Sequence, residues 1–393
     1  MTFMPIRCDI FCNVIDNYGD IGVCWRLARI LANEHGHAVR LWVDDLSSFS
    51  KLCPDADIAL ERQRCRGVDV CLWRKEFSEI QPAELVIEAF SCKLPLNYIE
   101  AMAAQVPQPV WINLEYLSAE EWVESHHKLP SPHPTWPLTK YFFFPGFTQQ
   151  TGGLLLERDL LARRDAFLSN AAQQRAFWQT IGMKMPSAET LKISMFSYEN
   201  AALPGLFDSW SISARPILCL VPEGRILPQV GQYFADPVPR AGCDYARGNL
   251  QVYVLPFVEQ ERYDLLLWAC DVNFVRGEDS CVRAQWAARP FVWHIYPQHD
   301  AVHLKKLLAF LILYDNHLSQ SASRALAGLW QSWNTEGEAG QAWPAFAAEL
   351  DGINRSAQDW AQQLAENDLA LNLLDFFREI GRMRALKIEG QQS

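Results

Sequence analysis

The sequence lacks several features that mark common classes of protein. It has no CxxC pair, no signal-peptide layout at its N-terminus, and no apolar run longer than the stretch around Leu307–Tyr314. Because a membrane-spanning helix needs about 20 apolar residues, we expect no membrane segment. The 11 cysteines mostly lie among apolar residues, which favours buried, reduced thiols over a disulfide framework or a zinc ribbon. These absences together predict a cytoplasmic protein.

A surplus of basic residues is also missing. The chain has 35 Lys and Arg against 46 Asp and Glu, a net charge of −11 and a pI near 5.4. An acidic surface repels phosphate backbones and anionic lipids, so we expect neither nucleic-acid nor membrane binding and favour a basic protein partner. The chain is otherwise an ordinary globular protein, with 393 residues, enough for two or three domains, and 49% hydrophobic residues.

Motifs for several kinds of catalysis are absent as well. The sequence contains no GxGxxG fingerprint, Walker A loop, GxSxG elbow or HExxH pair. The histidines gather at His126, His127 and His133, and at His299 and His303, without a nearby thiolate pair. We therefore expect no metal site.

What is abundant is aromatic residues, at 12% of the chain, including 15 tryptophans. Many of the tryptophans fall on apolar faces of predicted elements, where core packing is the expected role. This set includes Trp25, Trp42, Trp111, Trp268, Trp286 and Trp293.

Strand and helix patterns alternate in two consecutive series. In the first series, the predicted strands are Arg7–Ile15, Ala38–Val43, Leu85–Phe90 and Pro109–Leu114, with helices at Val23–His35 and Leu96–Gln105. In the second, the strands are Lys192–Phe196, Pro216–Pro222, Leu250–Leu255, Val272–Val275 and Phe291–His294, with helices at Gln260–Ala269 and Cys281–Ala288. This alternation predicts two Rossmann-like domains that face each other, with ligands at the carboxyl ends of the strands.

Two further segments flank or follow these series. The proline-rich residues Ser125–Pro137 predict a loop. After His303 the chain is largely helical, and Trp360–Met383 is its longest helical stretch. A helix of that length at the C-terminus is expected to cross back to the first domain.

The first candidate site is the predicted turn Asp16–Gly22, between the first strand and the first helix. It places Asp16 and Asp20 four residues apart, beside glycines that allow a substrate to approach the backbone. Carboxylates at this position suit a general base, or hydrogen bonds to a cationic acceptor such as a guanidinium. The alternative is structural, with one aspartate capping the helix and the other holding the turn.

The second candidate site, Arg276–Ser280, follows a predicted strand and opens the next helix. A helix N-terminus with glycine and serine suits an anion, and Arg276 adds a guanidinium fork that matches a diphosphate. Glu278 and Asp279 repel phosphate, so helix capping is an equally good interpretation of the segment. Side chains after other predicted strands suit a nucleobase, although loop packing also explains each one: Phe196, Tyr198, Phe257, Gln260 and Tyr296.

Two long stretches resemble one known family. They are CDIFCNVIDNYGDIGVCWRLARIL, followed by RLWVDDL, and DVNFVRGEDSCVRAQWAARPFVWHIYPQ. Both stretches, and the order of elements between them, are similar to the protein-arginine rhamnosyltransferases that act on elongation factor P, the EarP family. The resemblance implies an α/β fold of the GT-B type, with two facing Rossmann-like domains at residues 1–185 and 186–361. It also implies that a C-terminal helix, near residues 362–393, completes the first domain.

The resemblance further implies an activity and its residues. The activity is the inverting, metal-independent and cofactor-free transfer of L-rhamnose from dTDP-β-L-rhamnose to an arginine of elongation factor P. Asp16, Asp20 and Glu278 match the family's catalytic carboxylates, with Asp20 as the general base. The donor-binding positions would be Asn17, Tyr18 and Gly19 in the first domain, and Phe196, Tyr198, Phe257, Gln260, Arg276, Gly277, Asp279, Ser280 and Tyr296 in the second. Among these, Phe257 would stack on the thymine and Gln260 would bond its edge.

Two other functions stay open on the residues alone. Another GT-B transferase, with a different donor or a small-molecule acceptor, would share the diphosphate site but would not need an acidic pocket for arginine. A non-catalytic nucleotide-sugar-binding protein is the third interpretation. It is disfavoured because paired carboxylates do not assist the binding of an anionic donor.

Overall fold

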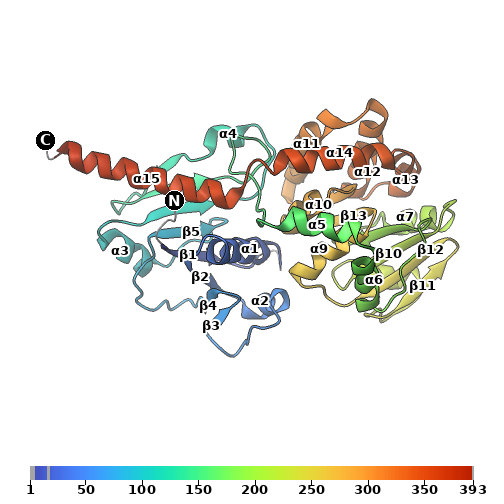
Figure 1. The fold of residues 1–393 in the computed structure, drawn as a ribbon, viewed down its shortest axis with the longest axis horizontal. Coiled ribbons are helices and arrows are strands. Elements are labelled where there is room, and N and C mark those ends of the chain that lie inside the picture. The colour runs from blue at the N-terminus through green and yellow to red at the C-terminus, as the bar shows by residue number, and fades with distance from the viewer. Residues whose placement is uncertain (1–4, 16–17, 392–393) are drawn as a thin grey trace. The chain divides into compact units, whose positions relative to one another are not determined.

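The computed structural model describes residues 5–15 and 18–391, and the chain divides into two compact units (Figure 1). The first unit comprises Met1–Arg158 and Leu364–Ser393, and the second comprises Asp159–Gln363. Each unit is a mostly parallel β-sheet with helices packed on it. This arrangement confirms the predicted α/β class.

The first unit contains an eight-stranded sheet in the order β3-β4-β2-β1-β5-β6-β8-β7. Its strands are β1 (Arg7–Cys12), β2 (Ala38–Val43), β3 (Arg62–Cys65), β4 (Val68–Leu72), β5 (Leu85–Ala89), β6 (Val110–Leu114), β7 (Pro130–Pro132) and β8 (Thr139–Phe143). All neighbours pair in parallel except β3 with β4 and β7 with β8, at the two edges. The central strands β5 and β6 are buried along their whole length, as expected when helices cover both faces of a parallel sheet.

The helices of the first unit are α1 (Gly19–Asn33), α2 (Leu46–Leu52), α3 (Leu96–Ala104), α4 (Trp122–His126) and α15 (Leu369–Gln391). Helix α1 packs on β1, β2 and β4, and α15 packs on β6 and on α1. Helix α3 completes an aromatic core in which Tyr98 and Met102 meet Phe11, Trp42 and Trp111 from the strands. Since β1, β5 and β6 are parallel neighbours, their carboxyl ends lie side by side at one edge of the sheet.

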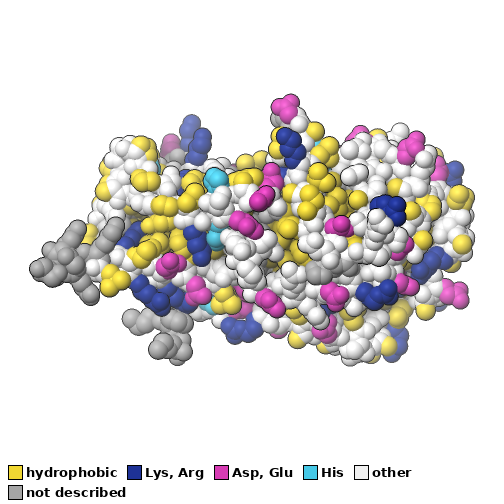
Figure 2. Space-filling view, turned by 90° about the horizontal axis from the view of Figure 1, so that it is seen from above, with side chains coloured by type: hydrophobic (Ala, Val, Ile, Leu, Met, Phe, Trp, Pro, Cys, Tyr) yellow, Lys and Arg dark blue, Asp and Glu magenta, His cyan; other side chains and the backbone are white. Residues whose placement is uncertain are grey.

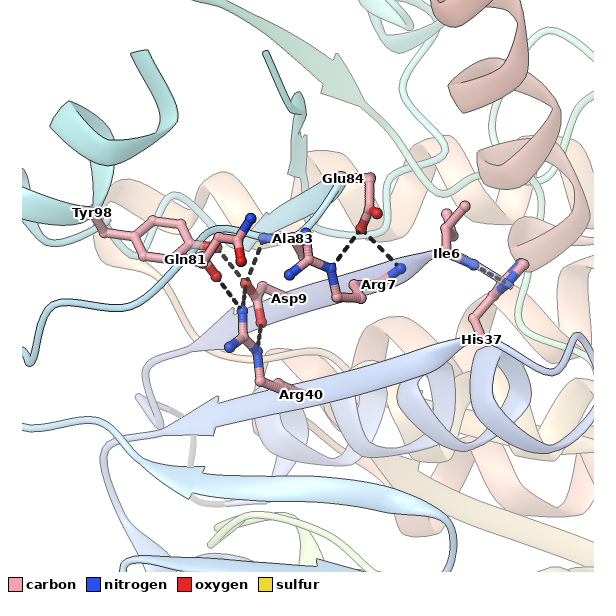
Figure 3. A network of polar contacts seen from close by, with 9 residues as sticks. All are labelled: Ile6, Arg7, Asp9, His37, Arg40, Gln81, Ala83, Glu84 and Tyr98. Carbon is pink, nitrogen blue, oxygen red and sulfur yellow. Dashed lines mark hydrogen bonds and ion pairs between the residues drawn. The ribbon is translucent and has the colours of Figure 1, made fainter. Parts of the chain in front are cut away.

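A buried polar network holds β1 to its neighbours in the first unit (Figure 3). The Asp9 carboxylate is fully buried. It accepts hydrogen bonds from Arg40 Nε and Nη2, both at 2.6 Å, from the Ala83 backbone N–H at 3.1 Å, from Trp42 Nε1 at 3.2 Å, and from the Tyr98 hydroxyl. Burial and the adjacent Asp9 raise the pKa of Tyr98 well above its ordinary value, so this hydroxyl remains a donor.

The second unit contains a six-stranded sheet in the order β11-β12-β10-β9-β13-β14. Its strands are β9 (Leu191–Met195), β10 (Ile217–Pro222), β11 (Asp244–Arg247), β12 (Leu250–Leu255), β13 (Val272–Arg276) and β14 (Phe291–His294). The α-helices are α5 (Leu160–Ser169), α6 (Ala171–Thr180), α7 (Leu203–Ser211), α8 (Leu227–Tyr233), α9 (Gln260–Ala269), α10 (Asp279–Trp286), α11 (Val302–Tyr314), α12 (Gln320–Asn334), α13 (Ala339–Ala348) and α14 (Leu350–Leu364). Strand β11 is antiparallel to β12, and the other neighbours are parallel.

The division between the units falls between Arg158 and Asp159, whereas the sequence placed it between residues 185 and 186. Helix α5 belongs to the second unit because it packs on α9, with the rings of Phe167 and Trp268 5.9 Å apart. Arg164 Nη1 also donates to the backbone oxygen of Trp286 at 2.9 Å. The apolar faces of α5 and α6 are short, so the sequence did not predict that these helices belong to the second unit.

The single helix predicted over Trp360–Met383 is wrong, because the chain contains two helices there. Helix α14 ends at Leu364 and α15 starts at Leu369. Between them, Asp368 forms a β-bridge with Leu154 and its Oδ1 accepts hydrogen bonds from the backbone N–H groups of Ala370 and Leu371. A contact with a distant segment thus breaks the helix, while α15 joins the first unit.

The segment predicted as a loop at Ser125–Pro137 contains regular structure. It includes the end of α4 and strand β7, whose Ser131 pairs with Lys140 of β8. Proline is tolerated in β7 because this strand lies at the edge of the sheet, where only one side must be hydrogen-bonded. The prolines therefore marked an edge strand.

The expectations about cysteine and tryptophan are confirmed. All 11 cysteines lie in the described part of the chain, each is a free thiol, and all but Cys243 are buried. The six tryptophans assigned to the core are buried as well. On the face shown in Figure 2, acidic and basic side chains are interspersed, so the net negative charge is not gathered in one patch there. No helix in the part of the chain that the structure describes is both long and apolar enough to span a membrane.

Candidate active site

The carboxylate of Asp20 is the best-defined predicted group in the first unit. Its residue lies in the first turn of α1, after the loop that leaves β1, and is only 4% exposed. Asp20 Oδ2 accepts a hydrogen bond from the backbone N–H of Ile15 at 2.9 Å, and Val14 N–H donates to Asp44 Oδ1 at 2.9 Å in the same loop. The carboxylate is thereby fixed at a helix N-terminus, where the helix dipole stabilises negative charge.

Helix α1 starts at Gly19, earlier than the predicted Val23, so Asp20 belongs to the helix and not to a turn. The N-cap position is Tyr18, whose backbone oxygen accepts the Gly22 N–H at 2.9 Å. Tyr18 and Gly19 are both partly buried beside Asp20. Asp20 therefore does not occupy the N-cap position of α1. The other two predicted residues of this loop, Asp16 and Asn17, lie outside the described residues.

Arg276 is the centre of the predicted site in the second unit. Its guanidinium carbon lies 4.6 Å from the ring centroid of Phe196 and 4.7 Å from that of Tyr198, and the residue is 6% exposed. Phe196 and Tyr198 follow β9, and Arg276 ends the neighbouring strand β13. Contact with two aromatic rings holds the planar guanidinium in one orientation, which suits recognition of a diphosphate.

The aromatic group around Arg276 extends to the end of β14. Tyr198 makes edge contacts with Tyr296 at 5.7 Å and with His294 at 5.2 Å between ring centroids. The Ser197 hydroxyl lies 2.7 Å from His294 Nδ1. Burial lowers the pKa of His294 to about 3, so its ring is neutral at physiological pH. His294 was not predicted as a site residue, although its place at the end of a strand, two residues before Tyr296, was a usable signal.

The turn between β13 and α10 is held by its own side chains. Ser280 Oγ accepts the Arg276 N–H at 3.1 Å and donates to the Arg276 backbone oxygen. Gly277 adopts a positive φ of 63°, and its oxygen accepts Trp293 Nε1–H at 2.8 Å. Helix α10 starts at Asp279, two residues before the prediction, with Glu278 at the N-cap but without a capping bond from its side chain. Capping by side chain therefore does not account for Glu278.

Gln260 and Asp279 are linked by a hydrogen bond from Gln260 Nε2 to Asp279 Oδ2 at 3.2 Å. This bond joins the start of α9 to the start of α10, and Gln260 is buried. Phe257 is partly buried in the turn between β12 and α9. The second unit thus brings most of its predicted residues to the carboxyl ends of adjacent strands, as the two-series pattern required.

The loop histidines have structural partners. His127 Nδ1 accepts the backbone N–H of Phe144 at 3.1 Å, and His133 Nδ1 accepts those of Thr135 and Trp136 at 3.2 and 3.1 Å. Burial lowers the pKa of His127 to about 4. Across residues 5–15 and 18–391, no group of three or more His, Cys, Asp or Glu side chains is placed to hold a metal ion.

Comparison with known proteins identifies relatives over nearly the whole chain. The family model for "Elongation-Factor P (EF-P) rhamnosyltransferase EarP" matches residues 8–378. A protein-arginine rhamnosyltransferase of Pseudomonas putida is 51% identical over 377 residues, covering 95% of this chain and 99% of its own. One from Shewanella oneidensis is 41% identical over 390 residues, covering 94% and 97%.

Comparison with solved structures identifies proteins that share the fold of this chain. One that describes the "structural basis for EarP-mediated arginine glycosylation of translation elongation factor EF-P" has a TM-score of 0.68 and 39% identity, covering 95% of this chain and 99% of its own. A glycosyltransferase from Rickettsia africae has a TM-score of 0.52 at 9% identity, covering 96% and 99%, and shares the fold alone. The predicted GT-B type of α/β fold is confirmed.

Proposed function

Because the chain belongs to the family of elongation factor P rhamnosyltransferases, EarP, we propose that it transfers L-rhamnose from dTDP-β-L-rhamnose to an arginine side chain of elongation factor P. The observation that carries this proposal is the extent of the family match. Residues 8–378 include every position predicted for catalysis or donor binding. A translation factor as acceptor implies that the activity belongs to the cytoplasm.

The second unit supplies the groups for the donor. The Arg276 guanidinium and the backbone N–H groups of the first turn of α10 suit the diphosphate. Phe257, just before α9, suits stacking on the thymine, and Gln260, the first residue of α9, suits hydrogen bonding to its edge. Tyr198 and Tyr296 add ring surface near Arg276.

The first unit supplies the base for the acceptor. We propose one in-line displacement, in which a guanidinium nitrogen attacks the anomeric carbon and the bond to the diphosphate oxygen breaks, with inversion. Since the guanidinium holds its proton with a pKa above about 12, it needs a base when the C–N bond forms. Asp20 accepts that proton, and Asp16 or Glu278 holds the guanidinium or stabilises its charge.

The leaving diphosphate acquires negative charge in the same step. Arg276 and the N-terminus of α10 stabilise that charge electrostatically, so the leaving group needs neither a proton nor a metal ion. No cofactor takes part in this scheme, because the sugar nucleotide carries its own leaving group.

Intact-mass spectrometry of elongation factor P, incubated with the protein and dTDP-β-L-rhamnose, tests the proposal. The expected result is a gain of one deoxyhexose, which disappears when the acceptor arginine is changed to lysine. A parallel incubation with a different nucleotide sugar is the control for donor identity. If the protein binds the donor but the acceptor mass does not change, the proposed activity is wrong.

A further inference from the structure

A second group of polar side chains lies at the carboxyl edge of the first unit's sheet, outside the residues assigned above. It consists of Ser91, which follows β5, and of Asn113 and Glu115 at the end of β6. Strand β5 is paired with β1 on one side and with β6 on the other. With strands about 4.8 Å apart, the ends of β1 and β6 are separated by roughly 10 Å. The group is therefore at the same edge as the loop that leads to Asp20.

The backbone after β5 is strained. Phe90, Ser91 and Lys93 have φ values of 55°, 56° and 59°, in the left-handed region that is unfavourable for residues other than glycine. Buried side chains hold this conformation: Asn113 Oδ1 accepts the Ser91 N–H at 3.1 Å, and Glu88 Oε1 accepts the Lys93 N–H at 3.2 Å. Strain that the surrounding structure maintains in this way is concentrated at ligand-binding sites.

The strained turn orients the side chain of Glu115. Its Oε1 accepts hydrogen bonds from Asn113 Nδ2 and from Ser91 Oγ, the latter at 3.4 Å. Both donors are neutral, and the nearby Lys140 pairs instead with Glu88, at 3.2 Å. Partial burial raises the pKa of Glu115. A partly buried carboxylate that is held by neutral donors is suited to bind a cation from a ligand.

An aromatic pair adjoins this carboxylate. Tyr116, the next residue, stacks on Phe90 with ring centroids 4.5 Å apart and an angle of 19° between the rings. Tyr116 remains partly exposed. An aromatic ring next to a carboxylate is a combination that recognises the cationic side chains of arginine and lysine.

We propose that Glu115 binds a lysine or arginine side chain of the acceptor protein that lies next to the arginine receiving the sugar, with Ser91 and Asn113 as positioning residues. This inference rests on the proposed function, because it assumes a protein acceptor. It assigns to the first unit a second contact with the acceptor, separate from the carboxylate that removes the proton.

Steady-state kinetics of Glu115→Gln test the proposal. Glutamine keeps the size of the side chain and an oxygen for Asn113 and Ser91, but loses the charge. The KM for the acceptor protein should rise about tenfold or more, the loss typical of one hydrogen bond to a charged group. The KM for the donor and the kcat should stay within about twofold, because the proposal assigns Glu115 to the acceptor and not to the donor. Glu100→Gln, which removes an exposed charge on α3 of the same unit, is the matched control and should change neither KM.

Two additional measurements separate the possible outcomes. In the first, the acceptor's lysines and arginines near the target arginine are neutralised one at a time. Neutralising the residue that Glu115 binds should raise the acceptor KM of the wild type, but should not raise that of Glu115→Gln any further. An acceptor KM for Glu115→Gln within twofold of the wild type overturns the inference, as does an equal loss of donor affinity, which indicates a structural role.

Calorimetric titration of the acceptor protein without donor makes the test independent of turnover. If the wild type binds the acceptor but transfers no rhamnose, the proposed function fails while the Glu115 contact is still measured as a loss of affinity in the variant. If the wild type does not bind the acceptor, both the proposed function and the inference are wrong.

Discussion

Replacing Asp9 with asparagine measures how much the buried network of the first unit contributes to its stability. Asp9 Oδ2 accepts hydrogen bonds from Arg40, Ala83 and Tyr98, and Oδ1 accepts from Arg40 and Trp42. An asparagine places an NH₂ group at one of these two positions, where it meets donors. Of these donors only the Tyr98 hydroxyl can rotate and accept.

The expected magnitude follows from these contacts. A hydrogen bond to a charged group contributes about 1.5–3 kcal/mol, and a buried donor left without an acceptor costs about 1–3 kcal/mol. Breaking a buried ion pair from one side costs about 3–5 kcal/mol, and we expect Asp9→Asn to destabilise the first unit by that amount. For a unit of this size, 1 kcal/mol corresponds to roughly 2–4 °C, so its thermal transition should fall by about 6–20 °C.

An exposed ion pair between Arg7 of β1 and Glu84, just before β5, provides a matched control. Arg7 and Glu84 form an ion pair at 3.1 Å, but their side chains are 41% and 43% exposed (Figure 3). An exposed pair contributes less than about 1 kcal/mol, so Glu84→Gln should hardly move the transition. Differential scanning calorimetry and urea titration of both variants provide the comparison. Equal losses of stability in the two variants would show that burial does not decide how much each ion pair contributes.

Three further results are expected. Asp20→Asn keeps an oxygen for the Ile15 N–H but cannot accept a proton, so the rate of transfer should fall by a factor of about 10²–10⁴. The affinity for the donor, measured by calorimetry, should stay within a few-fold of the wild type. Preserved turnover would remove Asp20 as the base. Phe257→Ala should weaken donor binding by about 1–3 kcal/mol, the contribution of one stacked base, and an unchanged Kd would show that the ring does not contact the base. The pKa of His294 is about 3 in the folded protein, below the ordinary value of 6.5. Between pH 6.5 and pH 3 this residue binds a proton only in the unfolded chain, so the free energy of unfolding must fall as the pH drops through this range. The free energy of unfolding should fall by about 4 kcal/mol in total. His294→Gln should reduce the slope of this free energy against pH over the same range. An unchanged slope would contradict the effect of burial on His294.

Local patterns predicted several regular elements of the second unit well, but not β11, α7 or α8. Strand β12, helix α9 and strand β14 have the bounds that hydrophobic periodicity indicated. The starts of α1 and α10 were placed too late because glycines and acidic residues, which are typical of turns, lie in or just before their first turns. In the structure, the contacts of Asp20 with Ile15 and of Ser280 with Arg276 hold these turns.

The parts of the site that could not be predicted depend on strand order. Ser197 and His294 are 97 residues apart in sequence and meet because β9 and β14 both flank β13. Likewise, Ser91 contacts Glu115 only because β5 and β6 are neighbours. Periodicity identifies strands but does not give their order in a sheet, so residues at strand ends can be recognised from sequence while their partners cannot.

The placement of α15 in the first unit has a consequence for biosynthesis. The ring of Phe376 contacts Tyr141 and Phe143, and Arg384 Nη1 donates to the backbone oxygen of Gln108 at 2.7 Å. A ribosome produces the chain from its N-terminus, so the unit that is started first is the last to be completed. All of the second unit is available to fold before the final helix emerges. Until then the nascent first unit must keep the apolar surface that α15 covers exposed to solvent or to a chaperone.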